Sequence, residues 1–461
     1  MTEELPVTAD IHVTPVRPTE RIESIDVLRG FSLLGILLLN IASFALPSAA
    51  YMNPSAYGGH TGANLTYWLI HMAFFDGKMR AIFSMLFGAG ALILTSRAEA
   101  RGAGIETADI YYRRTMWLIA IGLFHAHLIW YGDILYPYGV VGLLMFPMRK
   151  ASAKALIITG AIIITLHSAQ GIGGMFGIRE MKANAEKHDK IVASGGKPTD
   201  EQKDAAKEWK NLRELFMPDK EKIEKEIKQH RGGWVENLKL RAGEAAQFEF
   251  NMFFQFIFLD VLGMFILGMG LAKAGVFDAS RSYAFYTALI AAGFLIGVPL
   301  HYWAAFKWAQ SNFDFPEFLG YIASTADPGR FLVAGAYIGI IMIVCKSGIL
   351  RPVRFLLSSV GRTALSNYLL TSIVLTFVFN GYGLGLFAKY ERSQLIWFVL
   401  AMWTVNLTLS PIWLKYYRYG PAEWAWRSLT YWKRQPLRRE QSFAPALHSP
   451  LPDPGIADTS Q

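Results

Sequence analysis

The sequence predicts an all-α fold, a polytopic membrane helix bundle of about ten spans with both termini in the cytoplasm. Apolar runs of membrane length recur along most of its 461 residues, of which 52% are hydrophobic. A bilayer core requires about 20 apolar residues per helix. Backbone amides in lipid must be paired within the chain, so continuous runs of this length form helices. They lack the alternation that is typical of a transmembrane β-strand.

The distribution of basic residues orients the spans. We expect spans near 27–47, 79–96, 115–131, 134–149, 154–176, 252–272, 283–303, 331–348, 361–380 and 394–414. Bases precede the first span, occupy every second loop and follow the last span, and the positive-inside rule places that side in the cytoplasm. The positions of the 45 Lys and Arg residues are therefore explained by the topology of the spans. We expect the lipid bilayer as a partner and no binding to nucleic acid.

The chain is expected to contain one large insertion. Residues 177–251 hold nearly equal acids and bases, and the run Asp219–Lys228 favours a helix through opposite charges at i,i+4 spacing. We place this segment outside the cytoplasm as a charged helical insertion, with a solvated hairpin without chemistry as the simpler alternative. The predicted segments are a disordered tail at 1–20, spans one to five at 21–176, the insertion at 177–251, spans six to ten with an interfacial helix at 252–432, and a disordered tail at 433–461.

Four polar residues are predicted to lie at one depth in the membrane. Asn40 and His125 each follow a basic residue at the cytoplasmic end of a span by eleven residues, which places both about 16 Å deep at 1.5 Å per residue. Asp260 and Asn406 lie near the middle of their own spans. Polar residues in spans usually face the bundle interior or an aqueous cavity. A shared central site is therefore one interpretation, and chance is the other.

His125 is the strongest single candidate for catalysis. A neutral imidazole can accept a proton at physiological pH, as a general base must. The alternative is a histidine that is hydrogen-bonded to a neighbouring helix. Asp133 follows in a short outer turn, where it either orients His125 or a substrate, or caps the next helix.

Two bases lie at the outer end of the second span, against the charge rule. Lys78 and Arg80 there need partners, such as Asp76, Asp133 or an anionic ligand, or else they extend to lipid headgroups. Gly88 and Gly90 in the same span favour close helix packing. The single cysteine, Cys345, excludes disulfides and Cys-ligated metals. We expect no metal site and no tightly bound cofactor, since no motif for either is present.

Three stretches together resemble a known family. They are Ile25–Asn40 (IDVLRGFSLLGILLLN), Gly122–Leu135 (GLFHAHLIWYGDIL), and Gly361–Tyr368 (GRTALSNY) with Gly420–Thr430 (GPAEWAWRSLT). The chain resembles the YeiB-like family of bacterial inner-membrane proteins, domain of unknown function 418, over about residues 21–432. That family is distantly similar to transmembrane acyltransferases such as the lysosomal heparan glucosaminide acetyltransferase. The resemblance implies a multi-pass protein of the bacterial inner (cytoplasmic) membrane.

The resemblance also suggests roles for single residues. His125 and Asp133 match the family's His and Gly-Asp-Ile-Leu positions. Arg29 and Asn40 match the first motif, and Arg362 and Asn367 match the third. The wider acyltransferases often carry their key histidine after the first span, where His60 or His71 would be the counterpart, although no motif around either fixes the alignment.

The leading hypothesis is an acyltransferase that moves an acyl group from a cytosolic donor to a hydroxyl or amine. His125 would be its base and Asp133 would orient it. Acyl-CoA is the expected co-substrate, and a small molecule or glycan is the expected acceptor. Arg29, Arg362 and Arg427 would bind the donor's phosphates. The substrate would contact Asn40, Lys78, Arg80, Asp260, Asn367 and Asn406. The alternatives are a transporter or permease for a small solute or ion, and a non-catalytic membrane scaffold.

Overall fold

The computed structural model describes residues 21–318, 320–321 and 324–439. Every regular element in these ranges is helical, and their one β-bridge is the isolated pair Tyr417 and Arg438. The predicted all-α class is therefore confirmed. The predicted tail at 1–20 and most of the tail at 433–461 lie outside the described residues.

The helices follow one another with short connections. They are α1 (Glu23–Ala45), α2 (Ala49–Met52), α3 (Gly62–Phe74), α4 (Lys78–Ala100), α5 (Glu106–Leu128), α6 (Leu135–Gly142), η2 (Phe146–Lys150), α7 (Ala153–Ala193), α8 (Asp200–Phe216), α9 (Lys220–His230), α10 (Trp234–Gln247), η3 (Phe248–Ile257), α11 (Phe258–Lys273), α12 (Tyr283–Ala292), η4 (Gly293–Gly297), α13 (Val298–Gln310), α14 (Phe315–Phe318), α15 (Ser324–Ser347), α16 (Arg351–Arg362), α17 (Ala364–Phe379), η6 (Arg392–Leu395), α18 (Ile396–Tyr416) and α19 (Pro421–Thr430).

Seven helical stretches among the described residues are long and apolar enough to cross a membrane. The count is eight if α16 and α17, which meet at a bend of 79°, form one span. All ten predicted spans fall on helices. Two of the predicted spans are not long and apolar enough by this measure. One lies on α5, which is charged in its first turns, and the other begins on α6, which has only eight residues. The total of ten spans stays a prediction.

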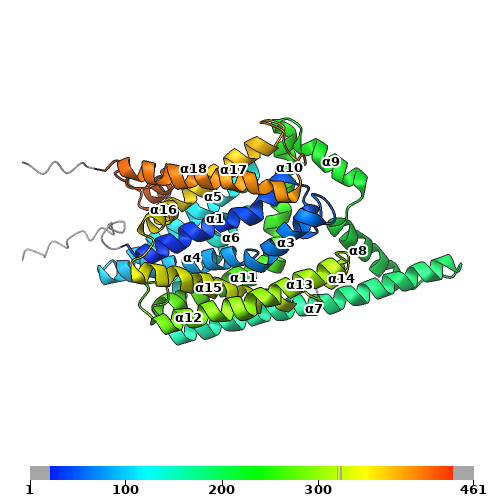
Figure 1. Ribbon diagram of the computed structural model, residues 1–461, viewed down its shortest axis with the longest axis horizontal. Helices are drawn as coiled ribbons and strands as arrows, with labels where there is room; N and C mark the ends of the chain where they lie inside the picture. The colour runs from blue at the N-terminus through cyan, green and yellow to red at the C-terminus, as the bar shows by residue number, and fades with distance from the viewer. Residues whose placement is uncertain (1–20, 319, 322–323, 440–461) are drawn as a thin grey trace, which may run out of the picture.

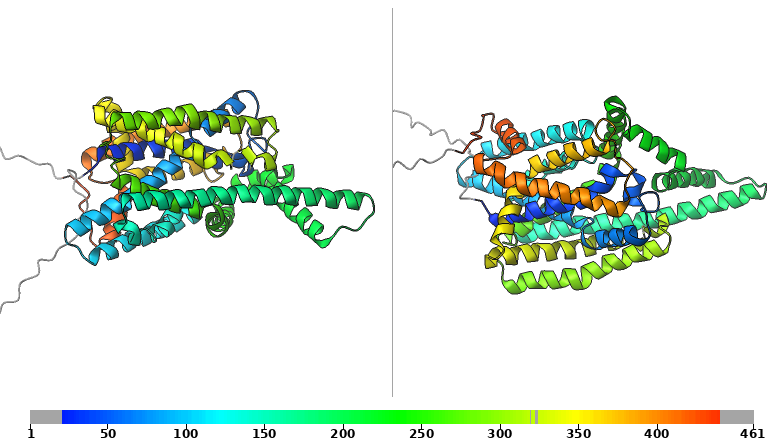
Figure 2. Two further views of the ribbon diagram at one scale, coloured as in Figure 1. Left: turned by 90° about the horizontal axis from the view of Figure 1, so that it is seen from below. Right: turned by 45° about the horizontal axis from the view of Figure 1, so that its top comes forward.

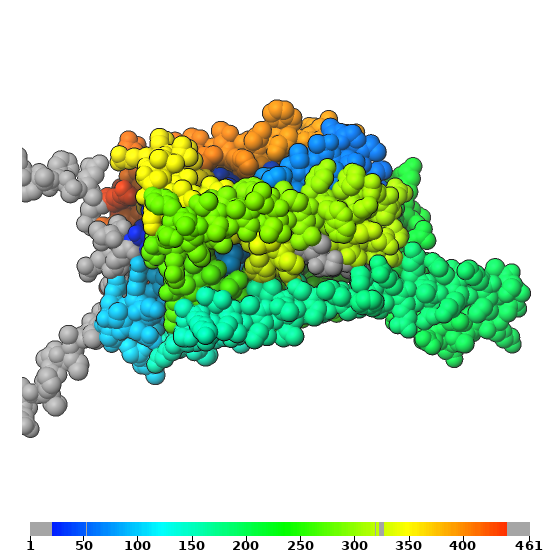
Figure 3. All heavy atoms as spheres, turned by 60° about the horizontal axis from the view of Figure 1, so that its bottom comes forward, coloured from blue at the N-terminus to red at the C-terminus, as the bar shows by residue number. Residues whose placement is uncertain are grey.

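The helices run side by side along the long axis of the molecule (Figure 1). The first and last described residues lie at one end of the bundle, and α8 and α9 lie at the other (Figures 1 and 2). The apolar window of α1 is 67% buried, whereas those of α7 and of α12–α13 are 17% buried. Figure 3 shows the side of the bundle that these outer helices form, and α7 extends beyond the other helices there. An apolar surface left exposed in this way suits contact with lipid.

Close backbone contacts hold α1 in the centre. A methyl group on Gly361 would overlap the carbonyl oxygen of Asp26, and one on Gly30 would overlap that of Leu357. Small residues let two helices approach in this way. Gly88 plays the same part between α4 and α11, because a methyl group there would overlap the carbonyl of Phe265. Gly90, for which we expected the same role, has open space beside it.

The predicted insertion is helical, but its last third differs from a solvated hairpin. α7 continues past residue 177, and α8 begins with a capping box of Thr199 and Gln202. From Trp234 the chain packs back against the bundle, and Arg241 and Glu249 are buried there. η3 leads directly into α11; of its aromatic residues Phe253 is buried, whereas Phe250, Phe254 and Phe256 are exposed.

Candidate functional site

A cavity of about 770 Å³ lies inside the bundle. Ile22, just before α1, and Ser48, just after it, both line this cavity. The 23 residues of α1 span about 34 Å at 1.5 Å per residue, which is close to the thickness of a bilayer core of about 30 Å. The cavity therefore follows α1 from one end to the other.

One end of the cavity is strongly basic. The three arginines predicted to bind phosphate all line it, and they come from α1, α16 and α19. Among the described residues, six arginines line this end together with two carboxylates, Asp26 and Glu423: Arg21, Arg29, Arg97, Arg114, Arg362 and Arg427. Such an excess of guanidinium groups in a hollow suits a phosphate-bearing ligand.

Aromatic rings hold several of these arginines in place. The guanidinium of Arg114 lies 3.6 Å from the ring centroid of Trp426, and that of Arg427 lies 4.7 Å from the ring of Tyr419. Burial lowers the pKa of the Arg427 guanidinium. A partly buried cation gains from an anionic partner.

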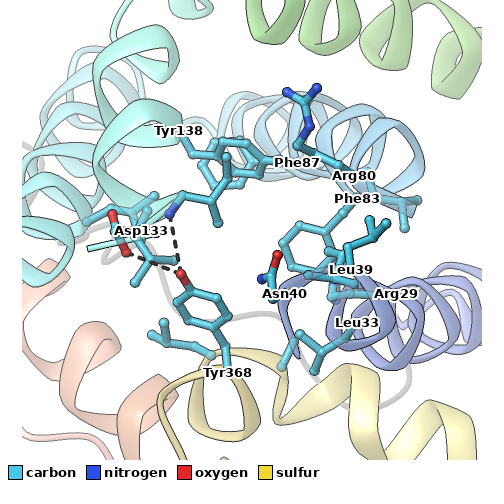
Figure 4. Close-up of a pocket in the computed structure, with 18 of the residues that line it drawn as sticks. Arg29, Leu33, Leu39, Asn40, Arg80, Phe83, Phe87, Asp133, Tyr138 and Tyr368 are labelled. Carbon is cyan, nitrogen blue, oxygen red and sulfur yellow. Dashed lines mark hydrogen bonds between the residues drawn. The ribbon is translucent and has the colours of Figure 1, made fainter. Parts of the chain in front are cut away.

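The middle of the cavity is lined by Asp133 and Tyr368, which face Asn40 of α1 (Figure 4). The hydroxyl of Tyr368 lies 3.5 Å from Oδ1 of Asp133 and accepts a hydrogen bond of 3.3 Å from the backbone of Ile134. The other carboxylate oxygen accepts a 2.7 Å bond from the backbone N–H of Tyr136 at the start of α6. Asp133 is thus fixed from both sides, and it does cap the next helix.

His125 lies behind Asp133 and does not line the cavity as described. Its Nδ1 is 2.8 Å from Oδ1 of Asp133, and the side chains of the two residues are 0% and 1% exposed. Its ring lies 4.9 Å from that of Tyr368, and its Nε2 has no hydrogen-bond partner among the described residues. The predicted pair of His125 and Asp133 is therefore present, but Asp133 faces the cavity and His125 lies behind it. The turn that carries Asp133 passes between the histidine and the cavity.

The two bases at the start of α4 have different surroundings. Arg80 lines the cavity and donates a 2.6 Å bond to Asp260, which in turn binds Arg330 at 2.5 Å. Its partner is thus neither Asp76 nor Asp133. Lys78 is fully buried away from the cavity, with Nζ at 2.5 Å from the carbonyl of Met72 and 3.2 Å from Nδ1 of His301. Lys78 and Asp260 are therefore not in reach of a ligand in the cavity as described.

The other two predicted asparagines join helices. Asn367 donates a 2.9 Å bond to Ser410, and Asn406 donates a 3.4 Å bond to Thr371, so both link α17 and α18. Neither lines the cavity. The four polar residues predicted to lie at one depth therefore do not form a single site, because only Asn40 among them lines the cavity.

The two histidines suggested as counterparts in the wider acyltransferases also lie outside the cavity lining. The ring of His60 packs against Phe313, and that of His71 stacks on Tyr67.

Sequence reasoning missed three residues of the cavity wall. Tyr368 directly follows Asn367 in one of the quoted motifs, and its position next to a motif residue was a usable signal. Tyr138 is one turn into α6, and its hydroxyl lies 2.5 Å from that of Ser84. Trp426 belongs to the last quoted motif and was not connected with Arg114, because 312 residues separate them.

Comparison with known proteins gives a consistent result. Residues 271–433 match the family model described as "Protein of unknown function (DUF418)". The chain is 31% identical over 424 residues to the "Uncharacterized protein YeiB" of Escherichia coli (strain K12), covering 89% of this chain and 96% of that protein. It is 28% identical over 449 residues to the "Uncharacterized protein YxaH" of Bacillus subtilis (strain 168), covering 92% and 98%. It is 26% identical over 434 residues to the "Uncharacterized 39.9 kDa protein in amylase 3'region" of Bacillus acidopullulyticus, covering 92% and 97%.

Proposed function

The chain belongs to the YeiB-like DUF418 family, and from this premise we propose that it is a membrane acyltransferase that uses an acyl donor carrying phosphate groups. The observation that supports the proposal is that one cavity joins a basic end to a buried carboxylate that is backed by a histidine. Arg29 and Arg362 lie at the basic end, and Asp133 lies in the middle of the same cavity.

The donor is an acyl thioester of coenzyme A. Its phosphates bind Arg29, Arg362 and Arg427, since guanidinium groups pair with phosphate oxygens through several hydrogen bonds at once. The pantetheine arm of the donor extends along the apolar wall of α1, where Leu33 and Leu39 line the cavity. The thioester carbon then reaches the depth of Asn40 and Asp133.

Asp133 acts on the acceptor. Its carboxylate takes the proton from a hydroxyl or amine of the acceptor as the oxygen or nitrogen forms a bond to the thioester carbon. The carbon–sulfur bond breaks, and the thiolate of coenzyme A takes up that proton, so that one ester or amide and one thiol are formed. The Nδ1–H of His125 stabilises the carboxylate from behind, as a buried hydrogen-bond donor does for an anion.

The proposal includes an orientation. The protein crosses the bacterial inner membrane with about ten spans, with its termini and the basic end of the cavity in the cytoplasm and with α8 and α9 outside. In a Cys345→Ser background, a cysteine at Ser194 at the end of α7 should react with an impermeant maleimide on intact cells. A cysteine at Ser280, between α11 and α12, should react only after the membrane is opened. The reverse pattern would invert the orientation.

The test of activity uses purified protein, labelled acyl-CoA and a mixture of hydroxyl and amine acceptors. The background is Cys345→Ser, so that the only thiol released comes from coenzyme A. We expect Asp133→Asn to lower the rate of thiol release by about 10²–10⁴-fold, the usual contribution of a general base. Asp189→Asn is the matched control, because this carboxylate is 80% exposed on the insertion. Equal rates in both variants would exclude Asp133 as the base.

A steric variant tests the cavity itself. Gly90 lines the cavity, and a Cβ atom there meets no atom within 4 Å. Gly90→Leu should therefore narrow the cavity and raise KM for acyl-CoA without displacing a neighbouring helix. No thiol release and no transfer of label by the wild type with any acceptor would remove the enzyme proposal.

Transport of a small solute is the second candidate, because the cavity is also lined at its other end, by Tyr51, Trp68 and Phe318. A passage lined at both ends of the bundle suits alternating access to a central site. Vesicles containing the protein would then show solute-dependent proton flux, and Gly90→Leu would block it.

A further inference from the structure

The described residues contain a second group of titratable side chains outside the cavity. Glu226 and His230 lie on α9 of the insertion, and Glu244 lies on α10. One carboxylate oxygen of each glutamate and one ring nitrogen of the histidine lie within 4.8 Å of one another. The two glutamates are spaced far apart in the sequence, so the fold brings them together.

We propose that Glu226, His230 and Glu244 form a binding site for a divalent transition-metal ion of the zinc type. One imidazole nitrogen and two carboxylate oxygens make a ligand set that suits such an ion. Zinc at about 2.0–2.2 Å from each ligand atom brings these atoms to about 3.3 Å from one another. Small rotations of the side chains on binding are sufficient, since Nε2 of His230 is already 4.0 Å from Oε1 of Glu244.

The histidine is held with Nε2 toward Glu244. Nδ1 of His230 lies 3.2 Å from Oδ1 of Asn380, whose amide nitrogen donates to the hydroxyl of Tyr382. Because that amide oxygen can only accept, Nδ1 carries the proton and Nε2 presents its lone pair. Most metal-bound histidines donate such a hydrogen bond from the ring nitrogen that does not bind the metal, and this bond fixes the tautomer.

The surroundings restrain the ring further. His230 stacks on Phe387 at 4.0 Å between ring centroids. Its backbone carbonyl accepts hydrogen bonds from Gly381 and from the side chain of Asn237. The imidazole thus has both its position and its rotation set before any ion binds, which lowers the cost of ordering the ligand.

Glu226 is restrained by a hydrogen bond, and space for an ion lies beside Glu244. Glu226 accepts a 2.7 Å bond from the backbone N–H of Ser48. A small cavity of about 20 Å³, lined by His230, Glu244 and Asn380, lies beside the group. It is large enough for one water-sized species, which needs about 10–15 Å³. The guanidinium of Arg241 also lines this space, but it is bound to the carbonyl of Leu128.

Two partly buried carboxylates at this separation repel each other unless a cation lies between them. The only other group of this kind among the described residues is His167, Asp260 and Asp327, and it already contains the guanidinium of Arg330, which binds both carboxylates. The group on α9 and α10 is not filled in this way. A divalent ion there would tie α9 to α10 beside Ser48, at one end of the cavity.

The test measures zinc binding to the full chain, purified with a tag that contains no histidine and stripped with a chelator. After dialysis against micromolar Zn²⁺, we expect one bound ion per chain by elemental analysis and a higher melting temperature. His230→Ala and Glu244→Gln should lose the ion. Asn380→Ala should weaken binding by about 10–100-fold, the usual effect of removing the group that orients a metal-bound histidine.

The matched control is His188→Ala, because His188 is paired with Asp189 on the exposed part of α7. This variant should bind one ion as the wild type does. The proposal is overturned if the wild type retains no zinc, or if His230→Ala and Asn380→Ala both bind it with unchanged affinity. Because Asn380 is not itself a ligand, its variant keeps the proposal testable even if a ligand variant does not fold.

Discussion

The imidazole of His125 lies against Asp133 with 2.8 Å between Nδ1 and Oδ1, and only the carboxylate of this pair lines the cavity. The pair is fully buried. A buried carboxylate must be paired or hydrogen-bonded to remain ionised. His125 therefore holds Asp133 in place, and acts on a ligand only through it.

Removal of the histidine should cost more stability than neutralisation of the aspartate. His125→Ala leaves a buried carboxylate without its partner, which costs about 3–5 kcal/mol in comparable buried pairs. Asp133→Asn removes the charge but keeps a side chain that can bond to His125, so its cost should be smaller. Thermal unfolding in detergent measures both, with His188→Ala, a partly exposed histidine on α7, as control. A smaller loss in His125→Ala than in Asp133→Asn would contradict this account of the pair.

Arg330→Met should destabilise the protein more than Arg80→Met. Arg330 binds both Asp260 and Asp327, and its side chain is only 7% exposed, whereas that of Arg80 is 34% exposed and binds Asp260 alone. Loss of Arg330 leaves two buried carboxylates short of a partner, for which we expect about 3–5 kcal/mol. The melting temperatures of the two variants show which substitution destabilises the protein more. Equal decreases would show that the bridge that Arg330 makes between Asp260 and Asp327 contributes little to stability.

The two glycines of α4 should respond oppositely to alanine. A methyl group at Gly88 overlaps the backbone of Phe265, so Gly88→Ala should cost about 1–3 kcal/mol or more through helix displacement. At Gly90 nothing lies within 4 Å, so Gly90→Ala should be neutral or stabilising by up to about 1 kcal/mol through helix propensity. Melting temperatures of the two variants give the answer. Similar values would mean that α4 and α11 are not packed as closely as described.

Stability should depend on pH through Glu423 on α19. Burial raises the pKa of this carboxyl above its ordinary value of 4.5. The folded protein therefore binds the proton more tightly than the unfolded chain does, and the stabilisation present below pH 4.5 is lost as pH rises through the folded pKa.

Glu423→Gln removes this titration but keeps an oxygen that can accept from the backbone N–H of Leu365, now 2.6 Å from the carboxylate. The melting temperature of the wild type minus that of Glu423→Gln should therefore fall as pH is raised from 4.5. A difference that rises with pH would mean that the hydrogen bonds to the carboxylate outweigh its burial.

The sequence allowed the fold class and one end of the cavity to be predicted. Apolar runs of membrane length lead to helices without further information, and the arginines that mark the ends of spans must gather at one end of any bundle with this topology. Arg29, Arg362 and Arg427 meet for that reason, although they come from three different helices.

The chemistry within the bundle was less predictable. His125 and Asp133 are eight residues apart, so their contact was within reach of sequence reasoning. Which of the two faces the cavity depends on the path of the turn between α5 and α6, and helix spacing does not contain that information. Depth along a helix likewise does not give rotation about it, and Asn406 and Asp260 face other helices and not the cavity. Glu226 and His230 do carry a local signal, since i,i+4 spacing places two ligands on one helix face.

The length of α7 provides a measure of where lipid gives way to water. The helix has 41 residues and is therefore about 60 Å long, which is about twice the thickness of a bilayer core. Its large exposed apolar side chains continue as far as Phe176, and no Asp, Glu, Lys or Arg lies between Lys154 and Arg179. We therefore predict that α7 passes from lipid into water near Gly177, at the plane of the headgroups on this face. A series of spin or fluorescent labels along α7 would locate that plane, and with it the depth of every residue that packs beside the helix.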